Sequence, residues 1–262
     1  MAHPPSSART FRVRRYECDA YGHVNNTAYL RYLDEAEYEA GLQPEGDPGI
    51  RVVDIEFLAP LAFGDEVTVT GVTEGQEPLR RGYEFVNPEN GERAARAKVV
   101  WASRSFETAR LELVPQPPRP AAAVFSQSRS VEWRDVDQTS RVSPATLAAY
   151  AEDCGVDLCS AYGWPMERCA AHGFAMVLRR HQIEYGEPLS LGDEFEVSSW
   201  ASGLRRSSAI RHYLIGSGGK QAARLRSQYV WVDLDTMRPI RIPEAFLEDF
   251  RSNFSGGDAE ER

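Results

Sequence analysis

Residues 19–26 of this 262-residue chain read DAYGHVNN and place a carboxylate, an imidazole and two side-chain amides directly before a helix-like run. A carboxylate such as Asp19 could attack a carbonyl carbon directly or activate a water molecule. The N-terminus of the following helix would offer free N–H groups to a developing oxyanion. The stretch therefore contains the groups that hydrolysis of an acyl compound needs.

Each of these residues also has an ordinary structural interpretation. His23 could polarise a carbonyl, protonate a leaving group or order the loop. Asn25 or Asn26 could orient water or substrate, but Asn is also a favoured helix cap. Gly22, beside Tyr21, lets the backbone turn tightly and approach a ligand, and glycine is common in plain turns. Spacing alone does not decide between these interpretations.

The chain contains the same unit twice. IEFLAPLAFGDE at 55–66 matches IEYGEPLSLGDE at 183–194 in seven of twelve positions, where chance would give about one. The offset is 128 here and 118 upstream, where Asp19 aligns with Asp137, so the second copy has 128 − 118 = 10 extra residues within 155–182. We expect a domain at 1–116, a Pro- and Ala-rich linker at 117–126, a second domain at 127–254 and a polar tail at 255–262.

Each copy has the same expected order of elements. A short strand (11–18 and 128–135) precedes a helix (27–41 and 144–163) whose apolar residues recur at three- and four-residue steps. Runs rich in β-branched and aromatic residues follow, at 50–58, 65–73, 81–87 and 93–106 and again at 174–185, 193–201, 207–215 and 220–234. The sequence therefore predicts an α+β fold in which each unit is one helix packed on a curved antiparallel meander of about four or five strands.

The second copy begins its helix without the residues of the first. At offset 118, Gly22 becomes Ser140, His23 becomes Arg141 and the two asparagines become Ser-Pro. Ser at the cap followed by Pro at the first helical position is a routine helix start. The residues of 19–26 are therefore not needed merely to begin a helix, and we expect the second site to be inactive, reshaped or used for binding.

Composition and motifs argue against several classes of protein. A net charge of −9 is unlike that of nucleic-acid-binding proteins, no apolar run approaches the roughly 18 residues that span a bilayer, and the N-terminus has no signal-like apolar segment. The four cysteines form no C-x-x-C pair, so we expect free thiols in the cytoplasm, with Cys18 a minor candidate for a reactive thiol. GSGGK at 216–220 lacks phosphate-loop spacing, and G-x-S-x-G and H-E-x-x-H are absent. We expect no metal and no cofactor.

The stretch YECDAYGHVNNTAYLRYLDEA at 16–36 resembles the signature of hotdog-fold thioesterases of the 4-hydroxybenzoyl-CoA thioesterase type. A P-x-x-x-G-D pattern follows at 60–65 and recurs at 188–193. The tandem layout is similar to that of plant acyl-carrier-protein thioesterases, although those carry the active signature in the second unit. The resemblance implies a double hotdog that binds acyl thioesters between its paired units, and it implies that Asp19 is a nucleophile or general base.

The predicted site extends beyond this loop. Each copy has a Leu-Arg-Arg step, whose arginines could bind the phosphates of CoA or an acidic carrier protein, or could be solvated strand-end charges. The extra residues at 161–174, with Trp164, Met166 and Phe174, could cap an acyl pocket or form a longer helix and a packed loop. Asp34 and Glu35 are expected on a solvated helix face. The predicted catalytic residues are Asp19, His23 and Asn25, and the predicted substrate-binding residues are Tyr21, Gly22, Asn26, Arg80, Arg81, Arg205 and Arg206.

The resemblance implies an acyl thioesterase that acts on acyl-CoA or acyl carrier protein. From cysteine content, charge and hydropathy we expect it in the cytoplasm, with no nucleic-acid or membrane partner. We expect a homodimer of tandem-hotdog chains. The alternative is a hotdog protein that binds acyl thioesters without cleaving them, because the second copy has lost the motif. A hydratase on the same fold would have His five residues after Asp, whereas His23 follows Asp19 by four.

Overall fold

The computed structural model describes residues 7–39, 50–76, 79–101 and 124–254. The chain forms two compact units, unit 1 with Met1–Leu113 and Gln182–Glu184, and unit 2 with Val114–His181 and Tyr185–Arg262. Most of the predicted linker, 117–123, and the predicted tail, 255–262, lie outside the described residues. The first strand of unit 2 begins at Phe125, inside the range expected for the linker.

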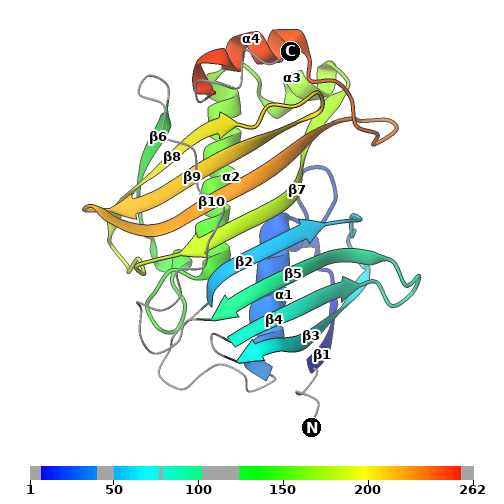
Figure 1. The fold of residues 1–262 in the computed structure, drawn as a ribbon, viewed down its shortest axis with the longest axis vertical. Helices are drawn as coiled ribbons and strands as arrows, with labels where there is room; N and C mark the ends of the chain where they lie inside the picture. The colour runs from blue at the N-terminus through cyan, green and yellow to red at the C-terminus, as the bar shows by residue number, and fades with distance from the viewer. Residues whose placement is uncertain (1–6, 40–49, 77–78, 102–123, 255–262) are drawn as a thin grey trace. The chain divides into compact units, whose positions relative to one another are not determined.

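Unit 1 is a five-stranded antiparallel sheet with one long helix (Figure 1). Its elements are β1 (Ser7–Arg12), the 3-10 helix η1 (Arg15–Glu17), α1 (Asn26–Glu39), β2 (Ile50–Phe57), β3 (Glu66–Gln76), β4 (Leu79–Val86) and β5 (Arg93–Trp101). The strand order is β1-β3-β4-β5-β2.

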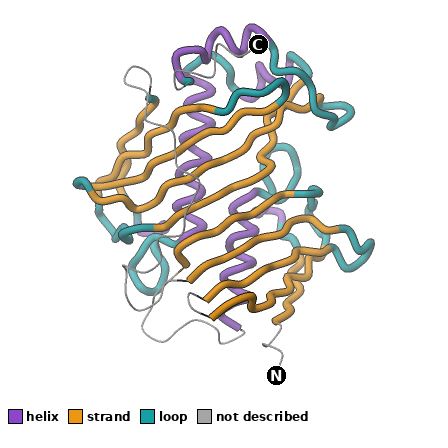
Figure 2. The backbone as a smooth tube through the Cα atoms, viewed as in Figure 1, coloured by secondary structure: helices purple, strands orange, loops and turns teal. Residues whose placement is uncertain are grey.

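Helix α1 lies against one face of this sheet (Figure 2). The ring of Tyr29 meets Phe57 at 5.3 Å and Phe85 at 5.5 Å between centroids, both edge-on. Alternate side chains of β4 are buried, and Tyr83 and Phe85 face the helix side with Arg81 because side chains of a strand point to opposite faces in turn.

Unit 2 repeats this arrangement and adds short helices (Figure 1). Its elements are β6 (Phe125–Ser130), η2 (Trp133–Asp135), α2 (Pro144–Ala161), α3 (Met166–Ala171), β7 (Phe174–Tyr185), β8 (Glu194–Ser202), β9 (Ser208–Ser217), β10 (Lys220–Asp233), α4 (Glu244–Phe250) and η3 (Arg251–Asn253). The strand order is β7-β10-β9-β8-β6. The elements β6, η2 and α2 begin 118 residues after β1, η1 and α1 (125 − 7, 133 − 15 and 144 − 26). None of the described helices combines the length and apolar character that a membrane span requires.

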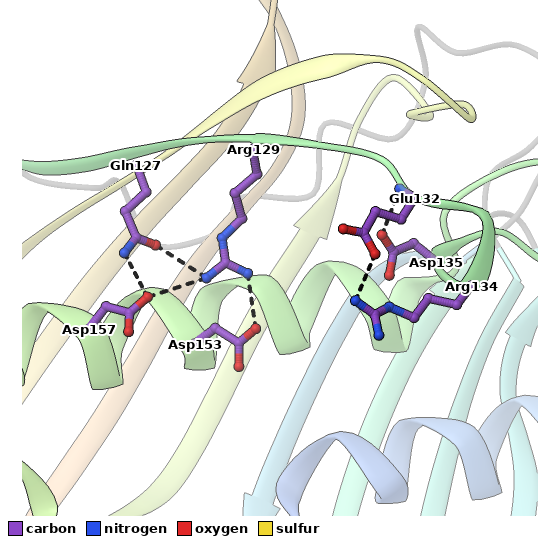
Figure 3. Close-up of polar contacts among 7 residues, drawn as sticks. All are labelled: Gln127, Arg129, Glu132, Arg134, Asp135, Asp153 and Asp157. Atoms are coloured by element: carbon purple, nitrogen blue, oxygen red, sulfur yellow. Dashed lines mark hydrogen bonds and ion pairs between the residues drawn. The ribbon is translucent and has the colours of Figure 1, made fainter.

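The first strand of each unit is joined to its helix by ion pairs. In unit 2, Arg129 pairs with Asp153 at 3.0 Å, and Gln127 donates to Asp157 at 2.7 Å (Figure 3). In unit 1, Arg9 pairs with Glu35 at 3.1 Å. Because these side chains are partly or largely exposed, each pair contributes at most about 1 kcal/mol. Glu35 therefore serves as a surface contact between the helix and the first strand of unit 1.

Two expectations about the strands were wrong. The strand expected at 11–18 ends at Arg12, and that at 128–135 ends at Ser130. The carboxylate of Glu17 accepts a 2.7 Å hydrogen bond from the N–H of Arg14, and this contact closes the 3-10 turn η1. The carboxylate of Asp135 closes η2 in the same way, at 2.8 Å.

The order of the strands also differs from a simple meander. Only β3, β4 and β5 are neighbours in chain order, whereas β2 pairs with β5, with Val53 opposite Val99. The other edge of β3 is already occupied by β1, with Phe11 opposite Val67. Strands β1 and β2 therefore lie at opposite ends of the strand order of unit 1.

The extra residues of unit 2 form part of its core. Helix α2 is longer than α1 and is followed by Trp164, and the short α3 is followed by Phe174. Both aromatic side chains are fully buried with Phe246 and Phe250 of α4. The indole N–H of Trp164 donates to Asp249 at 2.8 Å. The longer helix and packed loop are therefore confirmed within unit 2, and Met166 lies at its surface.

Candidate active site

A tight turn holds the candidate carboxylate in the motif loop, which we define as residues 18–26. The N–H of Asp19 donates to the carbonyl of His23 at 2.7 Å, and the N–H of Gly22 donates to the carbonyl of Asp19 at 3.0 Å. Gly22 has a φ of +81°, which glycine adopts without steric cost. Asp19 Oδ1 accepts from the N–H of Tyr21 at 2.9 Å and of His23 at 3.2 Å. One carboxylate oxygen is thus committed to the turn, and no described residue donates to the other.

The motif loop is tied to the turn that precedes β3. The N–H of Val24 donates to the carbonyl of Leu61 at 2.8 Å, and His23 forms an antiparallel bridge with Ala62. Asp65 Oδ2 accepts from the N–H of Ala62 at 2.8 Å and closes this second turn. The D-x-x-G-H-V-N-N and P-x-x-x-G-D patterns are therefore two parts of one structure.

Asn25 caps helix α1. Its Oδ1 accepts from the N–H of Thr27 at 2.8 Å, one residue into the helix that begins at Asn26. Ser143 does the same for α2, where its hydroxyl accepts from the N–H of Thr146 at 3.2 Å. The side chains of His23 and Asn26 make no hydrogen bond to any described residue, so these two groups can turn to a ligand.

Unit 2 contains the same turn without the glycine and the histidine of the motif loop. The N–H of Asp137 donates to the carbonyl of Arg141 at 3.0 Å, and Oδ1 of Asp137 accepts from the N–H of Thr139 at 2.7 Å. Ser140, at the place of Gly22, has a φ of +61°. The aspartate therefore supports the turn in both units, whereas an imidazole, that of His23, is found only in the turn of unit 1.

The strained serine yields a first prediction. A non-glycine residue in the left-handed region costs roughly 1–2 kcal/mol, so we expect Ser140→Gly to raise the free energy of unfolding by about 1 kcal/mol, as measured by urea denaturation. The matched exchange Gly22→Ser should lower it by a similar amount. An unchanged or lower stability of Ser140→Gly would show that the turn of unit 2 is not strained.

The cap at Asn25 can be tested in the same way. Asn25→Ala should lower the free energy of unfolding by about 1 kcal/mol, whereas Asn25→Ser should retain it, because serine performs this role in unit 2. Urea denaturation measures both. A loss of activity in Asn25→Ser at full stability would instead place Asn25 in the chemistry.

Arg80 lies far along its strand from the motif loop of unit 1. Arg80 is exposed at the start of β4. The end of β4 near the motif loop is Val86, which pairs with Thr68 of β3. Six residues at roughly 3.3 Å each separate Arg80 from Val86 by about 20 Å along the strand. Arg205 and Arg206 are exposed in the turn between β8 and β9 of unit 2.

Arg81 requires a correction. Its side chain has no exposed surface, and its Nε lies 3.3 Å from Oε1 of Glu37, which is equally buried. The hydroxyl of Tyr83 also donates to Glu37, and Arg81 Nη2 donates to Ser7 at 3.0 Å. A guanidinium buried beside its own counter-charge is not free to bind a phosphate, so Arg81 belongs to the interior of unit 1 and not to a substrate site.

Cys18 does not behave as a reactive thiol. Burial, and then the charge of Asp19, raise its pKa, which keeps the sulfur protonated. Among the described residues, no three His, Cys, Asp or Glu side chains are grouped to hold a metal ion.

Glu17 is a carboxylate that the sequence analysis missed. It is buried and accepts a 2.8 Å hydrogen bond from the hydroxyl of Tyr32, while its carbonyl accepts from the N–H of Asn25 at 2.8 Å. It therefore fixes the entrance and exit of the motif loop relative to α1. The signal was present in the repeat, where Glu17 aligns with Asp135 and Tyr32 with Tyr150.

Comparisons with known proteins find a similar family for each unit. Residues 3–103 match the family model for the acyl-ACP thioesterase C-terminal domain, and residues 131–250 match that of the thioesterase-like superfamily. No curated protein sequence gives a significant match.

Solved structures resemble the whole chain. A Lactobacillus plantarum protein assigned as an oleoyl thioesterase is 15% identical, with a TM-score of 0.68 over 93% of this chain and 99% of that chain. The 12:0-ACP thioesterase of Umbellularia californica is also 15% identical, with a TM-score of 0.67 over 86% and 93%. An acyl-ACP thioesterase of Bacteroides thetaiotaomicron is 14% identical, with a TM-score of 0.62 over 86% and 97%. At these identities the likeness establishes the fold, and it confirms the double hotdog of the α+β class.

The two family matches fall one on each unit, and the match of the first unit is to the C-terminal domain of acyl-ACP thioesterases. Each unit thus matches a thioesterase family model, and the chain is a thioester hydrolase with the hotdog fold.

Proposed function

We propose that the motif loop of unit 1 hydrolyses the thioester of an acyl carrier protein. The observation that carries this proposal is the pair of groups found in unit 1 and absent from unit 2. In unit 1 an anchored carboxylate, Asp19, lies on the same turn as the imidazole of His23, whereas Asp137 shares its turn with Arg141.

The geometry supports specific roles for these groups. Two backbone N–H groups hold Oδ1 of Asp19, so Oδ2 has a fixed direction in which to take a proton from water or attack the carbonyl carbon. His23 protonates the departing thiolate, and the amide of Asn26 orients the substrate. When Asp19 activates water, the water oxygen displaces the thiolate and the free acid forms directly. When Asp19 attacks, the thiolate leaves and water then cleaves the resulting anhydride to release the free acid. The positive end of the α1 dipole favours the oxyanion.

The carrier is proposed from the family of unit 1. The matching model describes acyl-ACP thioesterases, which favours acyl carrier protein over acyl-CoA. A cytoplasmic homodimer of double-hotdog chains remains our proposal for location and assembly.

Binding without cleavage is the second candidate function. It is favoured by one observation, namely that Asp19 and Asp137 perform the same structural task in their turns. In that case the motif loop would hold an acyl thioester without attacking it.

Thiol release with matched substrates tests the proposal. The native protein is supplied with the same series of acyl chains on carrier protein and on CoA, and free thiol is followed with time. We expect turnover on at least one chain length, with a higher kcat/KM for the carrier protein than for CoA. Equal or higher kcat/KM for CoA would overturn the choice of carrier, and tight binding without thiol release would support the binding protein.

A further inference from the structure

Three aromatic rings project into solvent around the motif loop of unit 1. Tyr16, Tyr21 and Phe63 are 74%, 41% and 66% exposed, and we call them the aromatic rim. Single exposed rings are common on protein surfaces, but several around one site indicate a surface that binds a partner.

The three rings lie on segments that are fixed relative to Asp19. Tyr16 belongs to η1, Tyr21 to the motif loop and Phe63 to the turn before β3. The thiol of Cys18 contacts the backbone of Phe63, and the bonds from Val24 to Leu61 and from Asn25 to Glu17 join the three segments. The aromatic rim is therefore preorganised, which lowers the entropic cost of binding.

Two arginines accompany the aromatic rim. The side chain of Arg14 is 60% exposed and hydrogen-bonded to Tyr16, and it also pairs with the buried Glu17 at 3.3 Å. Arg15 is exposed, and no described carboxylate pairs with it. The chain as a whole has a net charge of −9, so an acidic partner would be repelled by most of its surface, and the guanidinium of Arg15 offers it a favourable local contact.

Unit 2 lacks this combination. The residues equivalent to the aromatic rim are Arg134, Thr139 and Leu191, by the offsets of 118 and 128. Unit 2 does expose one ring at its turn, Trp133, which aligns with Arg15 and is 80% exposed. The aromatic rim therefore accompanies the unit that carries the candidate active site, and Trp133 provides a matched control.

We infer that the aromatic rim, with Arg14 and Arg15, is the docking surface for the acidic carrier protein that presents the acyl group to Asp19. Exposed aromatic and arginine side chains are the residue types that contribute most to protein interfaces. This inference rests on the proposed function, because it takes the acyl group to reach Asp19 on a carrier protein.

Substitutions in the aromatic rim test the docking surface. Tyr16→Ala, Phe63→Ala and Arg15→Glu are compared with Trp133→Ala, after thermal unfolding has shown that each variant is folded. Two quantities are measured: the affinity for carrier protein that bears no acyl group, and the ratio of kcat/KM for acyl carrier protein to that for the same acyl-CoA. We expect each rim variant to lower both by at least about tenfold, and Trp133→Ala to change them less than about twofold. The effect of Arg15→Glu should shrink at high salt.

Three results would overturn the inference. These are unchanged carrier affinity in the rim variants, an equal loss with acyl-CoA, and a change of oligomeric state, which would assign the surface to a second copy of the chain. The affinity measurement keeps this test separate from the proposed function. A native protein that binds the carrier through the rim but cleaves no thioester would refute the chemistry alone, whereas cleavage unaffected by the rim variants would refute the docking surface alone.

Discussion

Replacing Asp19 with asparagine is expected to lower kcat for thiol release by about 100-fold or more. Asparagine retains an oxygen that can accept from the N–H groups of Tyr21 and His23, at 2.9 and 3.2 Å in the native turn, so the motif loop should keep its conformation. What the variant loses is the negative charge and the second carboxylate oxygen, to which no described residue donates. The effect should therefore appear in kcat and not in stability.

The matched control is Asp137→Asn in unit 2. It makes the same chemical change in the same type of turn, where Oδ1 accepts from the N–H of Thr139 at 2.7 Å. We expect its kcat and its free energy of unfolding to stay close to those of the native protein. Equal losses in the two variants would mean that the aspartates act only by holding their turns, and an unaffected Asp19→Asn would place the active site elsewhere.

Breaking the buried ion pair of unit 1 is expected to have the largest effect on stability. Glu37 and Arg81 have no exposed side-chain surface, and removing one of them leaves the other as an uncompensated buried charge. Glu37→Leu or Arg81→Met should each lower the free energy of unfolding by about 3–5 kcal/mol. Urea denaturation at pH 8, where Glu37 is ionised, measures this loss.

The combined variant decides what the pair contributes. When Glu37→Leu, Arg81→Met and Tyr83→Phe are made together, no buried polar group is left without its partner, and most of the lost stability should return. Unit 2 already shows that the fold does not need the pair, because Gly155 and Ala209 align with Glu37 and Arg81. Losses that simply add in the combined variant would show that the residues do not act as a pair.

The same pair makes stability depend on pH. Burial raises the pKa of Glu37 to about 7 from an ordinary value of 4.5, and the guanidinium of Arg81 offsets only part of that increase. The folded state thus holds this proton more tightly than the unfolded chain does. The stability that proton binding to Glu37 adds is therefore fully present below pH 4.5 and is lost as the pH rises through about 7. Glu37→Gln should remove this dependence, and an unchanged pH profile in that variant would contradict it.

The internal repeat explains why most strands could be predicted. Each strand that follows the long helix was seen twice in the sequence, and β7 was located at 174–185 to the residue. The 3-10 helix η1 could not be predicted, because residues 11–18 alternate like a strand, and a contact between the Glu17 side chain and the backbone of Arg14 interrupts it. Helix α4 was missed because its seven residues are stabilised by packing on Trp164 and Phe174, which lie far away in the sequence.

The candidate site was partly visible in the sequence. The motif located Asp19 and His23, but only the structure shows that Asp19 also closes its turn and that Asn25 is a cap. Arg81 could have been recognised as buried, because strand alternation places it on the face of Tyr83 and Phe85, opposite to Arg80. Its partner Glu37 could not, because a charged residue on a helix is usually exposed.

A single-turnover experiment tests whether Asp19 carries out thioester hydrolysis, because it separates the chemical step from product release. The protein is mixed in excess over acyl carrier protein, and free thiol and free acid are quantified in quenched samples. We expect both products to appear in equal amounts with the native protein and at least about 100-fold more slowly with Asp19→Asn, although both proteins bind the substrate. Native protein that binds the substrate and forms no thiol, or an Asp19→Asn variant that forms it at the native rate, would contradict the account.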